Sequence, residues 1–282
     1  MKVLFCTDGS EISFRALKNF SKWGREVEMD AICVVDWSFL PDSVAIEDSN
    51  FEKSCANVAG RILERTEIEC ENLNINFQKQ IKCCGETVSG ILEQAQNEKY
   101  DLILMGSHGK KGIQRWLGSV SRDIVNNVTQ STYITKNVND CKKVLFAADG
   151  SSNSRFAASE AIKYLELKDK EIYIVIVLEN PNLLFLEGAL DAKWLMEIEE
   201  QQHRYATRTI LEVQEKLQKY GLKADKFAIL QGNPAEKIVE FSKKENIDLI
   251  ITGTKHSAKN QFHGSVSKRI LEITPSDVVI FK

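Results

Sequence analysis

Residues 3–10 of the chain read VLFCTDGS, and residues 144–151 read VLFAADGS. In both stretches a short apolar run ends in Asp-Gly-Ser, which is typical of a buried β-strand followed by a turn and a helix cap. The offset from residue 3 to residue 144 is 141 residues. Solenoid proteins repeat every ~20–50 residues, so this period indicates a duplicated domain.

The repeat continues to the end of each copy. Residues 101–106 (DLILMG) match residues 248–253 (DLIITG), and the four residues GSVS occur at 118–121 and again at 264–267. The polar stretch 137–142 separates the copies. We therefore predict two domains, at residues 1–138 and 142–282, in line with the usual ~100–200 residues per domain.

Apolar strands alternate with amphipathic helices in both copies. Helices are expected over residues 50–72 and 86–97, and another begins at Gly118-Ser119. Strands buried on both faces and separated by helices indicate a parallel sheet in an α/β fold with right-handed crossovers. The predicted strands are residues 3–7, 31–35, 74–81, 102–105 and 132–135 in the first copy, and 144–148, 173–178, 226–230, 249–252 and 278–281 in the second.

Composition and charge exclude several classes of protein. The formal net charge is -3, which gives no strong positive field for a nucleic acid or an anionic membrane. The longest strongly apolar run, Ile172–Leu178, is far shorter than the ~20 residues of a membrane helix. The seven cysteines are odd in number and none follows Cys141, unlike a secreted disulfide framework. We expect a cytoplasmic protein that binds neither nucleic acid nor membrane.

The carboxyl ends of parallel strands are where ligands bind in open α/β sheets. Asp8 and Asp149 follow the first strand of each copy, and a glycine-rich loop from Gly106 to Ser121 follows the fourth strand of the first copy. Glycines let main-chain N–H groups approach a phosphate, and a helix that begins at Gly118 favours an anion at its start. The hydroxyls of Ser119 and Ser121 are expected to add donors to such an anion. A glycine-spaced loop alone is a weak signal, because glycines also satisfy turns. Asp8 can equally cap the next helix.

With these residues in place, the chain resembles the universal stress protein family in its tandem form. Members that bind ATP carry Gly-x-x-Gly followed by a spacer and Gly-Ser/Thr; here Gly106-x-x-Gly109 precedes Gly118-Ser119. The resemblance implies two Rossmann-like, adenine nucleotide alpha hydrolase-like domains with five parallel strands in the order 3-2-1-4-5. It also implies bound ATP, or ADP or AMP, with Mg²⁺ for a triphosphate. The implied binding residues are Asp8, Val34, Met105, Gly106, Gly109, Gly118, Ser119 and Val120.

Some of these residues also have plainer interpretations. Val34 and Met105 would contact adenine by position in the family, but both are equally suited to the apolar core. In the second copy, His256 stands where the second glycine belongs, and its side chain would crowd a phosphate. We therefore expect nucleotide mainly in the N-terminal domain, with an altered or empty second site.

The sequence leaves three candidate functions. A nucleotide-binding stress-response or regulatory protein, acting through conformation or a partner, is favoured. The chain lacks a P-loop and a placed general base, so we expect no enzyme beyond slow ATP hydrolysis. The alternative is a tandem stress protein without nucleotide that binds an apolar small molecule or a protein partner, as the apolar segment 182–200 suggests. The simpler interpretation of that segment, which we favour, is a helix packed against the other domain. An enzyme on a related nucleotide-binding fold is least favoured, because its signatures are absent.

Two expectations concern assembly and metals. The last strands, residues 132–135 and 278–281, are expected to pair within one chain as a built-in pseudo-dimer, since unpaired edges need a partner. A homodimer of such chains is left open by the sequence. The histidines and cysteines show no metal-ligand spacing, so no metal site is expected apart from Mg²⁺ carried by a triphosphate.

Overall fold

The computed structural model spans residues 1–282, and the structure describes residues 1–36, 49–108, 117–136, 140–179, 192–254 and 264–282. The elements of the first half are β1 (Lys2–Cys6), α1 (Glu11–Phe20), β2 (Glu28–Val35), α3 (Ser49–Asn72), β3 (Asn76–Cys84), α4 (Thr87–Asn97), β4 (Leu102–Gly106), α5 (Ser119–Asn127) and β5 (Ser131–Thr135). Those of the second half are β6 (Lys143–Ala147), α6 (Ser152–Tyr164), β7 (Glu171–Leu178), α7 (Ala192–Lys219), β8 (Lys226–Gln231), α8 (Pro234–Glu245), β9 (Leu249–Gly253), α9 (Ser265–Ile273) and β10 (Asp277–Phe281).

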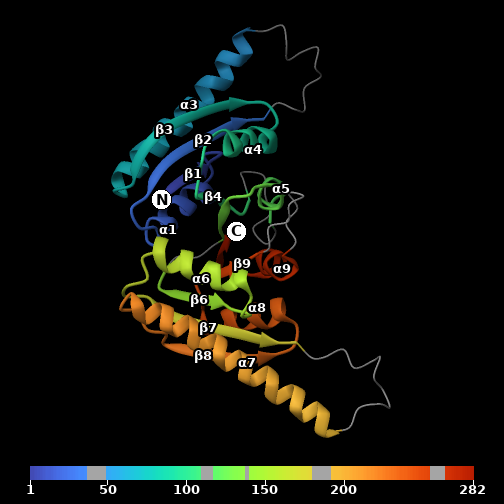
Figure 1. Ribbon diagram of the computed structural model, residues 1–282. Coiled ribbons are helices and arrows are strands. Elements are labelled where there is room, and N and C mark those ends of the chain that lie inside the picture. Colours follow the sequence, from blue (N-terminus) through green and yellow to red (C-terminus); the bar gives the residue numbers. More distant parts are fainter. Residues whose placement is uncertain (37–48, 109–116, 137–139, 180–191, 255–263) are drawn as a thin grey trace.

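The strands form one ten-stranded sheet in the order β3-β2-β1-β4-β5-β10-β9-β6-β7-β8 (Figure 1). Within each half all neighbours are parallel, and each half has the order 3-2-1-4-5. The α/β fold with two tandem domains is thus confirmed. β5 and β10, the strands expected to pair within the chain, are antiparallel neighbours with Tyr133 opposite Val279.

Alternation along the strands explains why both faces of the sheet are covered. In β1, Val3 and Phe5 pack on one face with Leu17 of α1, whereas Leu4 packs on the other face with Ile124 of α5. Side chains of α1, α3, α6 and α7 belong to the first layer, and those of α4, α5, α8 and α9 to the second. Because successive strand residues point to opposite faces, a strand buried on both faces reads as a continuous apolar run.

A buried carboxylate joins the two halves at the centre of the sheet. Asp277, at the start of β10, is fully buried. Its Oδ1 accepts the Lys136 N–H at 2.8 Å, and its Oδ2 accepts Asn19 Nδ2–H at 3.0 Å and the Tyr133 hydroxyl at 2.9 Å. All three donors belong to the first half. At the corresponding place in the first copy, the Ser131 hydroxyl accepts the Lys282 N–H at the longer distance of 3.4 Å.

This carboxyl group makes stability depend on pH. Burial raises the pKa of Asp277 from 3.8 to about 6. A carboxyl group whose pKa is higher in the folded state than in the unfolded state stabilises the fold when the pH is below its unfolded-state pKa. This contribution is lost as the pH rises through the folded-state pKa. Between roughly pH 4 and 7 the free energy of unfolding of the wild type should fall by about 3 kcal/mol relative to that of Asp277→Asn, because each pKa unit corresponds to roughly 1.4 kcal/mol. Urea unfolding of both proteins across this range checks it, and parallel pH profiles would contradict it.

Candidate functional site

The first half has a cavity of about 510 Å³ at the carboxyl ends of β1, β2 and β4. Seven of the eight residues predicted for nucleotide binding line it: Asp8, Val34, Met105, Gly106, Gly118, Ser119 and Val120. The eighth, Gly109, lies outside the described residues. The volume falls within the ~300–1,000 Å³ typical of small-molecule sites. Residues that come from four distant segments of the sequence therefore meet at one cavity.

One wall of this cavity is apolar. Val34 and Ile32 come from β2, Met105 comes from β4, and Ile91 comes from α4. Ile32, Ile91 and Met105 are almost fully buried, and Val34 is partly exposed. Val34 and Met105 therefore belong to the core layer and also line the cavity. Such a wall suits a flat, apolar ring.

Another part of the cavity wall is formed by the start of α5. Gly118 is the N-cap residue and provides no side-chain cap, and the first helical bond runs from the Arg122 N–H to the Gly118 carbonyl. By contrast, the hydroxyls of Ser10 and Ser151 cap α1 and α6. The first N–H groups of a helix need acceptors, and the helix dipole favours an anion there. This wall can therefore accept a phosphate.

Gly118 closes the loop onto this helix. Its N–H donates to the Ser107 carbonyl at 2.7 Å. A Cβ at Gly118 would lie 3.2 Å from that carbonyl oxygen and 3.4 Å from the His108 Cα. Contacts this short are tighter than real Cβ atoms usually make. Glycine thus serves the chain packing as well as any approach by a ligand.

Asp8 sits in the turn between β1 and α1. Its Oδ1 accepts the Ser10 N–H at 3.0 Å, and Gly9 has φ +73°, a conformation that glycine adopts readily. The N-cap of α1 is Ser10, whose hydroxyl accepts the Ser13 N–H, so the alternative of Asp8 as the helix cap is wrong. The carboxylate holds the turn and also lines the cavity.

His108 adds a titratable group to the cavity wall. Its Nδ1 lies 3.0 Å from the Ser107 hydroxyl. Burial lowers the pKa of His108, the charge of Lys136 lowers it further, and Asp8 opposes the shift. The imidazole is therefore neutral near pH 7. Ser107 itself is 1% exposed, so its hydroxyl positions the ring and does not face a ligand.

Other lining residues differ from the sequence-based expectation. The Ser121 hydroxyl, expected to donate to an anion, donates instead to the Gly106 carbonyl at 2.8 Å. Asp36 and Thr87 were not selected, yet both line the cavity, and the Thr87 hydroxyl donates to Asp36 Oδ2 at 3.1 Å. Asp36 directly follows β2, and Asp8 lies two residues after the end of β1. Asp36 could therefore have been predicted from the sequence, because ligands bind at the carboxyl ends of parallel strands.

The second half departs from this arrangement. Thr252 replaces Met105, and its hydroxyl lies 3.0 Å from that of Ser267. The Thr254 hydroxyl is buried without a hydrogen-bond partner among the described residues, directly where a Cβ of Gly264 would point. Gly264 has φ -78° and ψ 84°, whereas Gly118 is extended. His256 lies outside the described residues.

The described residues contain neither a cluster of metal-ligating side chains nor a membrane-spanning helix. Within the part of the chain that the structure describes, no three His, Cys, Asp or Glu side chains gather as a metal site would require. Among those same residues, no helix combines the length and apolar character needed to cross a membrane. All seven cysteines are free thiols.

Comparison with known proteins gives one consistent family. The family model described as the universal stress protein family matches residues 1–136 and again residues 141–282. Universal stress protein MJ0531 of Methanocaldococcus jannaschii is 29% identical over 143 residues, which cover 50% of this chain and 82% of that protein. Universal stress protein Slr1230 of Synechocystis sp. is 24% identical and is matched over 99% of both chains.

Solved structures show the same fold. The crystal structure of a universal stress protein from Archaeoglobus fulgidus has a TM-score of 0.72 at 22% identity, and the match covers 100% of this chain and 98% of that one. A structure described as a putative universal stress protein from Pseudomonas aeruginosa has a TM-score of 0.66 at 14% identity and covers 100% and 92%. Both matches extend over the two halves together.

Proposed function

This chain belongs to the universal stress protein family as a tandem member, and on that premise we propose that it binds an adenine nucleotide in its first half. The bound nucleotide would act through conformation or a protein partner in a stress response in the cytoplasm. The observation that carries this proposal is the cavity at the ends of β1, β2 and β4, which combines an apolar wall with a helix start that has no side-chain cap.

Each wall of the cavity takes a different part of the nucleotide in this proposal. The adenine ring lies against Val34 and Met105, and Asp8 accepts hydrogen bonds from the sugar or the base. The phosphates lie at Gly118, Ser119 and Val120, where the start of α5 favours negative charge. The carboxylates of Asp8 and Asp36 are oxygen ligands of the kind that Mg²⁺ takes. A bound Mg²⁺ would neutralise part of the triphosphate charge.

The proposal assigns nucleotide to the first half alone. In the second half the Thr254 hydroxyl occupies the space into which a Cβ of Gly264 would point. Thr252 also places a polar hydroxyl where Met105 is apolar in the first half. We also propose slow hydrolysis at most. His108 is hydrogen-bonded to a serine whose side chain is hidden from the cavity, so that pair cannot supply an attacking hydroxyl.

Nucleotide analysis of the purified protein tests this function. Acid extraction followed by chromatography should release close to one ATP, ADP or AMP per chain, or stripped protein should show a higher melting temperature with ATP and Mg²⁺. A ligand that binds only the folded state stabilises by mass action, about 2.7 kcal/mol at 100 times its Kd. No extracted nucleotide together with no thermal shift would overturn the proposal.

That outcome would support the alternative function, a tandem stress protein that binds a partner or an apolar molecule without nucleotide. One observation favours it. Trp194 and Met196, in the part of segment 182–200 that the structure describes, are 46% and 71% exposed. They lie near the start of α7, which projects beyond the sheet (Figure 1), so the expected packing against the other domain does not hold for these two side chains.

A further inference from the structure

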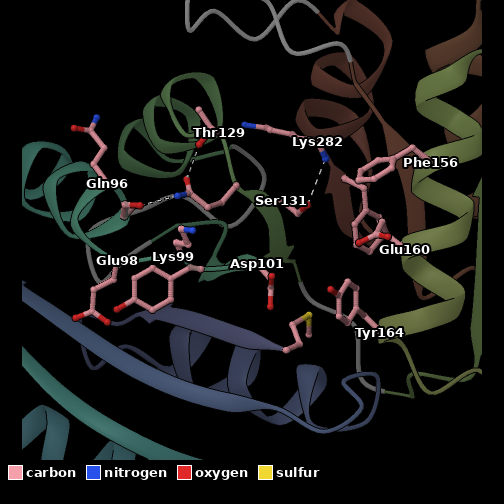
Figure 2. Close-up of a pocket in the computed structure, with 15 residues that line it drawn as sticks. Gln96, Glu98, Lys99, Asp101, Thr129, Ser131, Phe156, Glu160, Tyr164 and Lys282 are labelled. Atoms are coloured by element: carbon pink, nitrogen blue, oxygen red, sulfur yellow. Dashed lines mark hydrogen bonds between the residues drawn. The ribbon is translucent and has the colours of Figure 1, made fainter.

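The duplicated fold creates two equivalent grooves beside the central β5-β10 pair, and only one is filled by the chain itself. The filled groove holds Asn19, Trp23 and Asp277, all at most 2% exposed. The other is an open cavity of about 610 Å³ between the first half and helix α6 (Figure 2). Because the two halves share one fold, this difference arises from the side chains.

The side chains at equivalent positions of the two grooves differ. Counted from the caps Ser10 and Ser151, Glu160 takes the place of Asn19 and Tyr164 takes that of Trp23. Ser131 takes the place of Asp277 in the GSVS alignment. The amide-carboxylate bond that fills the first groove therefore has no counterpart in the second. Glu160 has no hydrogen-bond partner among the described residues.

The open groove combines carboxylates with aromatic rings. Glu160 lies on α6 with Phe156 one turn before it and Tyr164 one turn after it, so the three share a face. In Figure 2 they line one side of the cavity. Asp101 comes from the first half, where its Oδ2 accepts the Lys2 N–H at 2.8 Å. Phe156 is 44% exposed. Carboxylates beside ring faces are the groups that recognise organic cations.

The rim of this groove already holds an ammonium group of the chain. Lys163 Nζ lies 4.2 Å from the centre of the Tyr164 ring and donates to its hydroxyl at 2.8 Å. The hydrogen bond to Tyr164 raises the pKa of Lys163, and the charges of Glu160 and Asp101 raise it further. The ring and hydroxyl of Tyr164 therefore already hold one ammonium group of the chain at this wall.

Three cationic groups of the lining residues oppose the binding of a further cation: Lys282, Lys99 and the amino group of Met1, which donates to the Glu26 carbonyl at 2.9 Å. Lys282 Nζ donates to the carbonyls of Val125 and Val128 at 2.7 and 2.8 Å, and burial lowers its pKa to about 7. Its charge is therefore partly removed near neutral pH. Lys99 is exposed and can turn towards solvent, and Glu98, also in the lining, is paired with Lys2 and Lys79.

We propose that this groove binds a small linear polyamine, with ammonium groups at Glu160 and Asp101 and the methylene chain along Phe156 and Tyr164. The volume fits a molecule of this size. Binding here involves none of the residues of the nucleotide cavity. The proposal stands whether or not the chain binds nucleotide.

Isothermal titration calorimetry with spermidine tests it on the full chain at about 0.15 M salt, where exposed charges are largely screened. We expect saturable binding of one spermidine per chain. Glu160→Gln should weaken it about tenfold, the scale of one charge-assisted contact. The control Glu236→Gln removes an exposed carboxylate of α8 and should leave affinity unchanged. A neutral diol of similar length should not bind.

Two results would overturn the proposal: no saturable heat with spermidine, or equal weakening by the two glutamine variants, which would indicate general surface charge. Thermal melting followed by circular dichroism shows whether Glu160→Gln is as well folded as the wild type. Because Glu160 makes no hydrogen bond within the described residues, Glu160→Gln should melt at the wild-type temperature, so lost binding reflects the groove and not unfolding.

Discussion

Asp277→Ala should lower the free energy of unfolding by about 3 kcal/mol, because it removes the acceptor of three buried donors. Those donors are the Lys136 N–H, the Asn19 amide and the Tyr133 hydroxyl, all within 3.0 Å. Each unpaired donor costs about 1–3 kcal/mol, which is partly offset because a buried charge disappears. Urea or guanidinium unfolding of the full chain measures the loss.

Ser131→Ala is the matched control for this prediction. Ser131 occupies the equivalent place in the first copy and accepts one long hydrogen bond from Lys282. Its loss should therefore cost less than about 1 kcal/mol. If Asp277→Ala and Ser131→Ala destabilised the protein equally, or if neither did, the carboxylate would not hold the two halves together.

Asp8→Asn should weaken ATP binding about tenfold or more, since an amide accepts hydrogen bonds from a sugar or base less strongly than a carboxylate does. The turn itself should survive, because the Asn side-chain oxygen can still accept the Ser10 N–H that Asp8 Oδ1 accepts now. Calorimetric titration of stripped protein with ATP and Mg²⁺ gives the affinity.

The second copy supplies the control for this variant. Asp149 Oδ1 accepts the Ser151 N–H at 2.8 Å in an equivalent turn, and Gly150 has the same φ of +73° as Gly9. Asp149→Asn therefore makes the same local change and should leave ATP affinity unaltered. Unchanged or tighter binding by Asp8→Asn would show that Asp8 acts only as a repelling charge near the phosphates.

The fold was predictable because its signals are local and occur twice. Apolar runs such as Leu102–Gly106 are buried on both faces, and Ser10 and Ser151 cap the same helix of each copy. Boundaries were less certain. The strand expected at residues 74–81 is β3, Asn76–Cys84, because this strand is largely exposed and its apolar pattern is weak.

The cavity was predictable in part for the same reason. Strand ends and a glycine-rich loop located Asp8, Gly106 and Gly118 without knowledge of distances. Thr87 was missed because its role depends on a hydrogen bond to Asp36, 51 residues away. The Ser121 hydroxyl was assigned to a ligand because sequence cannot show that a main-chain carbonyl lies within reach.

The contact between the halves could not be predicted from local patterns. Asp277 precedes a run of apolar strand residues, and a carboxylate there is expected at the surface. Its partners lie on α1 and β5, up to 258 residues away. The open groove could not be predicted for the same reason. Only the three-dimensional structure shows that Asn19 pairs with Asp277. That pairing in turn shows that the equivalent residues, Glu160 and Ser131, leave their groove unfilled.

The number of ATP molecules bound per chain tests the central claim most directly. Titration of stripped, full-length protein with ATP and Mg²⁺ should give one site per chain, since the apolar wall and uncapped α5 start of the first half differ from the Thr252 and Thr254 arrangement of the second. A stoichiometry of two would contradict the distinction between the halves. A stoichiometry of zero would contradict nucleotide binding itself.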